Sequence, residues 1–142
     1  LDGLLTRHRR FVVLDLHSYN HRRSGPDGEP DDPRTSPDIN VGTGSVAARS
    51  WRKLIDRVID EAARFEIGDK PVSVGENVRF RGGYFPTWVN QNYGDRGCAL
   101  AIEVKKLYMD EWTGRIRPCE LRATVALIGR LAARATATLE EP

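Results

Sequence analysis

The sequence of this 142-residue chain lacks a large excess of charge of either sign, because 22 basic residues stand against 20 acidic ones. The resulting net charge of +2 provides no strong overall field to hold a polyanion, so we expect no nucleic acid as a partner. Long apolar runs are also absent: no stretch approaches the ~20 residues that cross a bilayer, and the first residues show no signal-peptide pattern. We therefore expect no membrane partner and a cytoplasmic location.

Cysteine is scarce as well. The two cysteines, Cys98 and Cys119, lie far apart and form no CxxC pair, so we predict that both are reduced thiols. With 39% hydrophobic and 30% charged residues, the composition is that of an ordinary globular protein. The length permits a real hydrophobic core, and we expect residues 1–142 to form a single domain.

The order of apolar patterns along the chain predicts an α/β fold. Short continuous apolar runs are typical of buried strands, and apolar residues at helical spacing indicate amphipathic helices. The predicted strands cover residues 11–17, 72–74 and 98–104, and the predicted helices cover 45–65, 87–92 and 121–139. Residues 18–40 contain four prolines and predict a long surface loop. This order favours a mostly parallel or mixed sheet flanked by helices.

Polar side chains at the end of the first predicted strand are the first candidates for chemistry, because the ligand crevice of an open α/β sheet lies beyond the carboxyl ends of its strands. His17 ends this strand, Asp15 points to the same face, and Ser18 follows. A histidine in this place could bind a divalent metal through one ring nitrogen, while Asp15 or Ser18, without binding the metal, fixes the other ring nitrogen. The alternative is a histidine that only bonds to the loop backbone.

Glu103 is the one carboxylate in a predicted strand that is otherwise apolar on both faces. An unpaired ionised carboxylate is costly there, so Glu103 needs either a function or a partner. Beside a metal it could take a proton from bound water and hand it to a leaving amine. The alternative is a structural ion pair with Lys105, Lys106 or an arginine of the 79–81 segment. The residues alone leave both interpretations open.

Arginines and glycines gather near residue 80. Arg79 and Arg81 are candidates to hold a substrate carboxylate, because a planar guanidinium suits a carboxylate, although most surface arginines are simply solvated. The paired Gly82 and Gly83 indicate backbone that passes close to another group.

Two further patterns are weak. His17 and His21 have the spacing of ligands on one helical face, but the glycine and proline that follow argue against a helix. An RNA-contacting surface could be built from Arg7, Arg9, Arg10, Arg22 and Arg23, although the near-neutral charge argues against it.

Four segments taken together resemble the second half of an N-formylglutamate amidohydrolase-family protein. They are VVLDLHSYNHRR at 12–23, INVGTGS at 39–45, FRGGYF at 80–85 and ALAIEVKKLYMDE at 99–111. Their order and intervals agree with the family as well, over nearly the whole chain up to about Trp112. The resemblance implies a phosphorylase/hydrolase-like α/β fold similar to the zinc carboxypeptidases. It also implies Zn2+ as cofactor and a small N-acyl amino acid, such as N-formylglutamate, as substrate, with hydrolysis of its amide bond.

The resemblance also carries roles to individual residues. His17, in DLHS, corresponds to the third metal ligand, and Glu103, in the ALxIE strand, corresponds to the general base and acid. Gly82, Gly83 and Tyr84 correspond to positions that line the substrate pocket.

The chain also departs from the family pattern. The family carries its first two metal ligands, a histidine and an acidic residue, ahead of the DLHS strand, where this chain has only its first ten residues. We therefore expect an N-terminally truncated domain that alone binds zinc poorly, since a catalytic zinc normally has three protein ligands. A metal-free binding or regulatory module of the same fold is the alternative function. The loop over 19–37 also differs, so the sequence leaves the acyl group and the amino acid open, as it does the oligomeric state.

Overall fold

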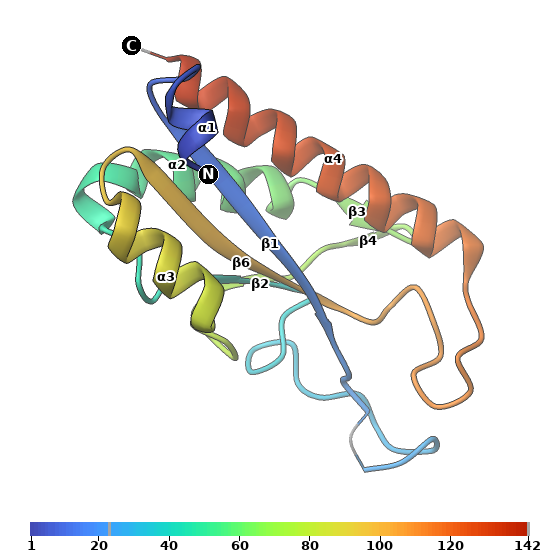
Figure 1. Cartoon of the computed structure of the whole chain (residues 1–142). Coiled ribbons are helices and arrows are strands. Elements are labelled where there is room, and N and C mark those ends of the chain that lie inside the picture. The colour runs from blue at the N-terminus through green and yellow to red at the C-terminus, as the bar shows by residue number, and fades with distance from the viewer. Residues whose placement is uncertain (23, 142) are drawn as a thin grey trace.

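A computed structural model describes residues 1–22 and 24–141, so Arg23 lies outside the described residues. Four strands form the main sheet: β1 (Phe11–Tyr19), β2 (Ile39–Gly42), β5 (Val74–Glu76) and β6 (Gly97–Lys105). Two short strands, β3 (Glu66–Ile67) and β4 (Lys70–Pro71), pair separately. The helices are α1 (Asp2–Leu5), α2 (Ala48–Ala63), α3 (Tyr84–Tyr93) and α4 (Pro118–Glu140). The predicted α/β fold is confirmed (Figure 1).

The main sheet is mixed, with strand order β1-β6-β2-β5. β1 runs parallel to β6, β6 is antiparallel to β2, and β2 is parallel to β5. The first predicted strand is parallel to its neighbour, but the expectation that it is a buried strand is wrong for most of its residues. Among the described residues β1 pairs only with β6, so it lies at the sheet edge, and Leu16 is 49% exposed.

Side-chain alternation divides the apolar residues between two faces of the sheet. Leu100 and Ile102 of β6 point to the face that α2 and α4 cover, and they belong to the larger core cluster. Phe11 of β1 and Ala99 of β6 point to the opposite face, where they pack with Val89 of α3. The two sides therefore differ: long helices cover one face, and a single ten-residue helix covers part of the other.

Helices α2 and α4 are also joined by a buried acidic side chain. Glu61 of α2 is only 6% exposed and accepts hydrogen bonds from Arg130 (2.6 Å) and Arg134 (3.1 Å) of α4. Burial raises the pKa of the Glu61 carboxyl, but the combined effect of the two arginines is larger and of opposite sign, so the pKa lies below its usual value. The ionised form of Glu61 therefore stabilises the fold above the pKa of the unfolded state.

We expect Glu61→Gln to lower the free energy of unfolding by about 1–3 kcal/mol at neutral pH, because the substitution removes a buried carboxylate that accepts hydrogen bonds from two guanidinium groups. The stabilisation by Glu61 is lost as pH falls through its folded pKa, which lies below the usual value, so the difference from wild type should shrink in acid. Urea unfolding at both pH values measures it, with the exposed Asp60→Asn on the same helix as control. An equal difference at both pH values would contradict the assignment.

Cys98 is buried and Cys119 is exposed, and both are free thiols, as predicted. Within the described part of the chain, none of the helices combines the length and the apolar character needed to cross a membrane.

Candidate active site

His17 and Glu103 occupy matching positions on neighbouring strands. The register of the parallel strands pairs His17 of β1 with Glu103 of β6, and Asn40 of β2 pairs with Glu103 from the other side. Residues that pair directly across strands point to the same face of a sheet, so these three side chains form one row. The row lies two residues before the carboxyl ends of β1 and β6, where a ligand crevice is expected.

Helix α3 does not cover the row of His17, Glu103 and Asn40, because the chain leaves the sheet surface into α3 beside Gly42 and Ala101, the pair that precedes this row. Two glycines bring the start of this helix against the sheet: a Cβ atom on Gly42 would lie 2.7 Å from the backbone nitrogen of Gly82. Gly82 has φ +96°, a conformation that favours glycine, and it sits above Ala101. The predicted close approach of the glycine pair is therefore confirmed for Gly82. Helix α3 covers the sheet up to Ala101 and leaves Glu103 uncovered.

We expect Gly42→Ala to lower the free energy of unfolding by about 1–3 kcal/mol, because the new methyl group must displace backbone atoms of the adjacent segment. The same substitution at Gly129 of α4 is the control, since a Cβ atom there meets nothing within 4 Å. Chemical denaturation measures both variants. If the two were equally stable, the two backbones would not be in close contact.

Asn40 fixes the segment that passes over the row, and sequence reasoning missed it. Its side chain is completely buried; Nδ2 donates to the carbonyl of Phe80 (2.8 Å). Oδ1 accepts from the backbone nitrogens of Arg79 (2.8 Å) and Phe80 (3.3 Å). The amide thereby places the Phe80 ring beside Glu103. One signal could have identified it: a polar amide between two apolar residues, Ile39 and Val41.

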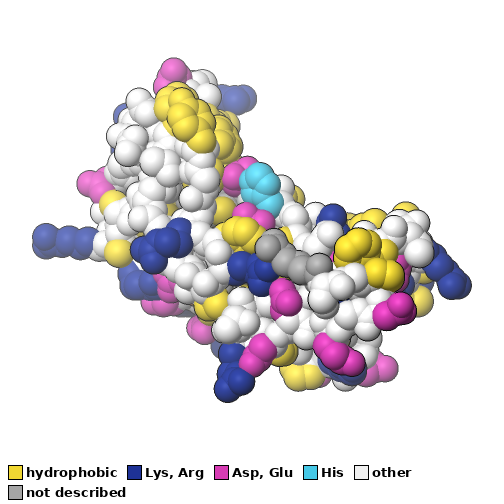
Figure 2. Space-filling view, turned by 90° about the horizontal axis from the view of Figure 1, so that it is seen from below, with side chains coloured by type: hydrophobic (Ala, Val, Ile, Leu, Met, Phe, Trp, Pro, Cys, Tyr) yellow, Lys and Arg dark blue, Asp and Glu magenta, His cyan; other side chains and the backbone are white. Residues whose placement is uncertain are grey.

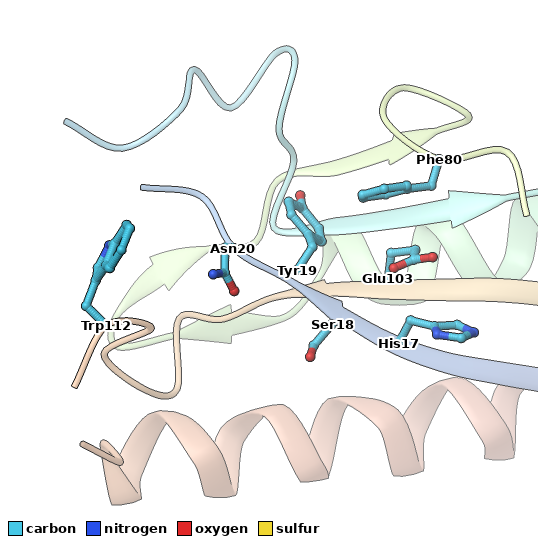
Figure 3. Close-up of a pocket in the computed structure, with 7 residues that line it drawn as sticks. All are labelled: His17, Ser18, Tyr19, Asn20, Phe80, Glu103 and Trp112. Atoms are coloured by element: carbon cyan, nitrogen blue, oxygen red, sulfur yellow. The ribbon is translucent and has the colours of Figure 1, made fainter. Parts of the chain in front are cut away.

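The row opens into a cavity of about 460 Å³ at the end of the sheet, a size in the range of small-molecule sites. Its lining residues are His17, Ser18, Tyr19, Asn20, Phe80, Glu103 and Trp112. Viewed from this end, the molecule shows histidine, acidic and hydrophobic side chains gathered in a hollow (Figure 2). Figure 3 shows His17 and Glu103 at one end of the cavity and Trp112 at the other. The structure therefore brings the predicted metal ligand and the predicted catalytic carboxylate to the same cavity.

The His17 ring is oriented by Asp15, whose Oδ2 lies 2.9 Å from Nε2. This hydrogen bond raises the pKa of His17 against the opposing effect of partial burial, and the negative charges of Asp15 and Glu103 raise it further. No described residue forms a hydrogen bond with Nδ1. The hydrogen bond between Asp15 and the ring is present, and the predicted role of Asp15 in supporting a metal ligand stays a prediction. The Ser18 side chain points toward α4 instead (Figure 3), and no described hydrogen bond joins it to His17.

Glu103 forms no ion pair or hydrogen bond with any described side chain. Its pKa is raised by burial, while the nearby His17 lowers it. The residues proposed as structural partners have other contacts: Lys105 pairs with Asp38 (3.1 Å) and Arg79 pairs with Asp31 (3.0 Å). The structure thus does not support a structural ion pair for Glu103.

The predicted substrate-binding residues lie beside the cavity, and none of them belongs to its lining. Arg79 lies over the rings of Tyr19 and Phe80, with its charge directed to Asp31. Arg81 is exposed and packs on Gly44, and Tyr84 is 86% exposed at the start of α3. Their predicted contact with substrate, like that of Gly82 and Gly83, stays a prediction.

The donor set for a metal is incomplete within residues 1–22 and 24–141. No group of three or more His, Cys, Asp or Glu side chains in this part of the chain is arranged to bind a metal ion. His17 offers one nitrogen, whereas a catalytic zinc normally has three protein ligands. The described residues therefore do not form a complete zinc site by themselves.

Comparison with known proteins gives a family. A model of the N-formylglutamate amidohydrolase family matches residues 1–109, and no curated protein matches the chain. The structure is similar to the crystal structure of N-formylglutamate amidohydrolase from Ralstonia eutropha JMP134, with 20% sequence identity and a TM-score of 0.56. The match covers 98% of this chain and 47% of that one, so this chain spans about half of that protein's length, and the likeness shows the fold. Because the family model covers most of the sequence, the chain belongs to the N-formylglutamate amidohydrolase family.

Proposed function

We propose that the whole protein hydrolyses the amide bond of an N-acyl amino acid, such as an N-formyl amino acid. Membership of an amidohydrolase family supports this reaction class. The observation that carries the proposal is the shared cavity of His17 and Glu103, which the register of β1 and β6 places side by side. Small polar substrates need such a site, where a few convergent polar groups lie at the end of a partly closed cavity.

Glu103 is proposed as the general base and acid. Its pKa is raised by burial, which brings it nearer to neutral pH and suits a group that both accepts and returns a proton. It takes a proton from the attacking water and delivers it to the amine that leaves when the amide bond breaks. The absence of any ion-pair partner among the described residues leaves the carboxylate available for both transfers.

His17 is proposed as one ligand of a catalytic Zn2+. Asp15 bonds to Nε2 and Nδ1 has no described partner, which suits a metal ligand whose second ring nitrogen is held by a carboxylate. The remaining ligands would have to come from outside the described residues of this chain.

Arg81 is a better candidate than Arg79 to bind the substrate α-carboxylate, because the Arg79 charge is already paired with Asp31.

Zinc content and turnover of the purified whole protein test the proposal together. We expect the wild type to release free amino acid from N-formyl amino acids and to hold stoichiometric zinc. We expect His17→Ala to bind zinc at least tenfold more weakly, a loss of about 1.4 kcal/mol or more. His8→Ala, which removes an exposed histidine outside the cavity, is the control. Full zinc retention by His17→Ala would exclude this residue as a ligand.

A metal-free binding or regulatory module is the second candidate, favoured by the incomplete donor set of the described residues. It predicts no zinc and no turnover, with binding of an N-acyl amino acid retained. The same two measurements separate it from the enzyme.

A further inference from the structure

We propose that the cavity selects an N-acyl amino acid with an aromatic or large aliphatic side chain rather than glutamate, an inference that rests on the proposed function. Three aromatic residues, Tyr19, Phe80 and Trp112, are among the seven that line it. They belong to three separate parts of the chain: the end of β1, the segment before α3 and the loop after β6. Aromatic rings from three distant segments therefore line the same cavity.

The polar groups of these rings are already used inside the protein. The Tyr19 hydroxyl donates a hydrogen bond to the carbonyl of Pro37, and its ring meets Phe80 edge to face at 5.3 Å. The indole nitrogen of Trp112 donates to the carbonyl of Arg22 (3.1 Å). Buried or bonded hydroxyl and indole groups leave only apolar ring surface to face a ligand. The rings offer hydrophobic contact and no hydrogen bonds, and the polar side chains of the lining are His17, Ser18, Asn20 and Glu103.

The positions of the rings are fixed before a ligand binds. Asn40 holds the backbone of Phe80 from both sides, through its amide nitrogen and its amide oxygen. The loop that carries Trp112 is tied to the end of β1, because the buried carboxylate of Glu111 accepts hydrogen bonds from the backbone nitrogens of His21 and Arg22. A preformed wall costs little ordering free energy when a ligand packs on it.

The charged residues of the cavity lining also favour an apolar substrate side chain. The described lining residues include one carboxylate, Glu103, and no lysine or arginine. The guanidinium of Arg79 lies near two of the rings but is paired with Asp31. A glutamate side chain that packs on the rings would lose hydration against apolar surface, and none of the described lining residues is a lysine or arginine that would offset this loss. An apolar side chain gains from the same surface.

Figure 3 gives the geometry of this selection. His17 and Glu103 lie at one end of the cavity, Tyr19 and Asn20 lie in the middle, and Trp112 lies at the far end. An amide placed at the first end directs the amino acid side chain along the Tyr19 ring toward Trp112. Phe80, which lies over Glu103, contacts the part of the substrate nearest the scissile bond.

Turnover of N-formyl-L-phenylalanine, N-formyl-L-alanine and N-formyl-L-glutamate by the zinc-loaded protein tests this. We expect kcat/KM for the phenylalanine substrate to exceed that for the glutamate substrate by about tenfold or more, and Trp112→Ala to lower the phenylalanine-to-alanine ratio by about tenfold. Trp112→Phe should restore part of that ratio. Trp88→Ala, which removes a 40% exposed ring of α3 outside the cavity, is the matched control. Preference for glutamate, or an equal loss on all substrates in Trp112→Ala, would overturn the inference.

Binding separates this inference from the proposed function. If no N-formyl amino acid is hydrolysed, the proposed function fails. NMR titration of the protein with N-acetyl-L-phenylalanine and N-acetyl-L-glutamate then decides the selectivity alone. Tighter binding of the phenylalanine derivative, weakened in Trp112→Ala, supports the aromatic wall, and equal binding of the two ligands overturns it.

Discussion

Glu103→Gln should lower kcat for hydrolysis of an N-formyl amino acid by about 10²–10⁴-fold, the contribution typical of a positioned general acid-base group. Glutamine keeps the shape of the side chain but can neither accept a proton from water nor return one to the amine. Because Glu103 has no described ion-pair partner and its pKa is raised by burial, the protein gives up little stability with the charge. We expect the free energy of unfolding to stay constant or to rise by up to about 1 kcal/mol.

Steady-state kinetics on zinc-loaded protein, with urea unfolding of the same samples, measures both effects. The control is Glu66→Gln, which removes an exposed carboxylate from β3, far from the cavity lining. Wild-type turnover by Glu103→Gln on every substrate of an N-acyl amino acid panel would contradict the catalytic role. A large loss of stability in this variant would instead indicate a structural partner for the carboxylate.

Asn40→Ala should lower the free energy of unfolding by about 2–4 kcal/mol, because it removes a buried amide and leaves two part-buried backbone donors and one acceptor without their partner. The affected groups are the nitrogens of Arg79 and Phe80 and the carbonyl of Phe80. The same change frees the segment that holds Phe80 over Glu103, so we also expect KM to rise for substrates with large side chains. This is the largest stability effect expected from one side chain of the site.

Thermal and chemical unfolding measure the Asn40 variants. Asn40→Asp keeps the acceptor and loses the donor to the carbonyl of Phe80, so its loss should be intermediate. Asn92→Ala is the control, since Asn92 is exposed and bonds only within α3. If Asn40→Ala were as stable as Asn92→Ala, the amide would not hold this segment.

Local sequence patterns predicted the elements that are long or strongly periodic. The apolar runs of β1 and β6 and the helical spacing of α2 and α4 are visible in the sequence, because β6 is buried along almost its whole length and each of the two helices buries one stripe over many residues. Strand β2 was missed and placed in a loop. It has only four residues, one of them Asn40, and it is held as a strand by pairing on both sides with β6 and β5, which no local pattern reports.

The candidate site divides in the same way. His17 and Glu103 are conspicuous as single polar side chains at the ends of apolar runs, so the sequence identified them as candidates. Their pairing depends on the register of two strands more than eighty residues apart, and only the structure shows it. Tyr19, Phe80 and Trp112 were not predicted to share a cavity, because no signal in an aromatic residue indicates which distant ring it will face.

A double-mutant cycle on kcat/KM tests the pairing of residues 17 and 103 most directly. If His17 and Glu103 act on one bound substrate in one cavity, the double variant His17→Ala/Glu103→Gln should be hardly slower than the slower single variant, since residues that act as a unit are strongly non-additive. Losses that multiply, so that the double variant falls by the product of the two single effects, would mean that the two side chains act independently and that their shared cavity is not the active site.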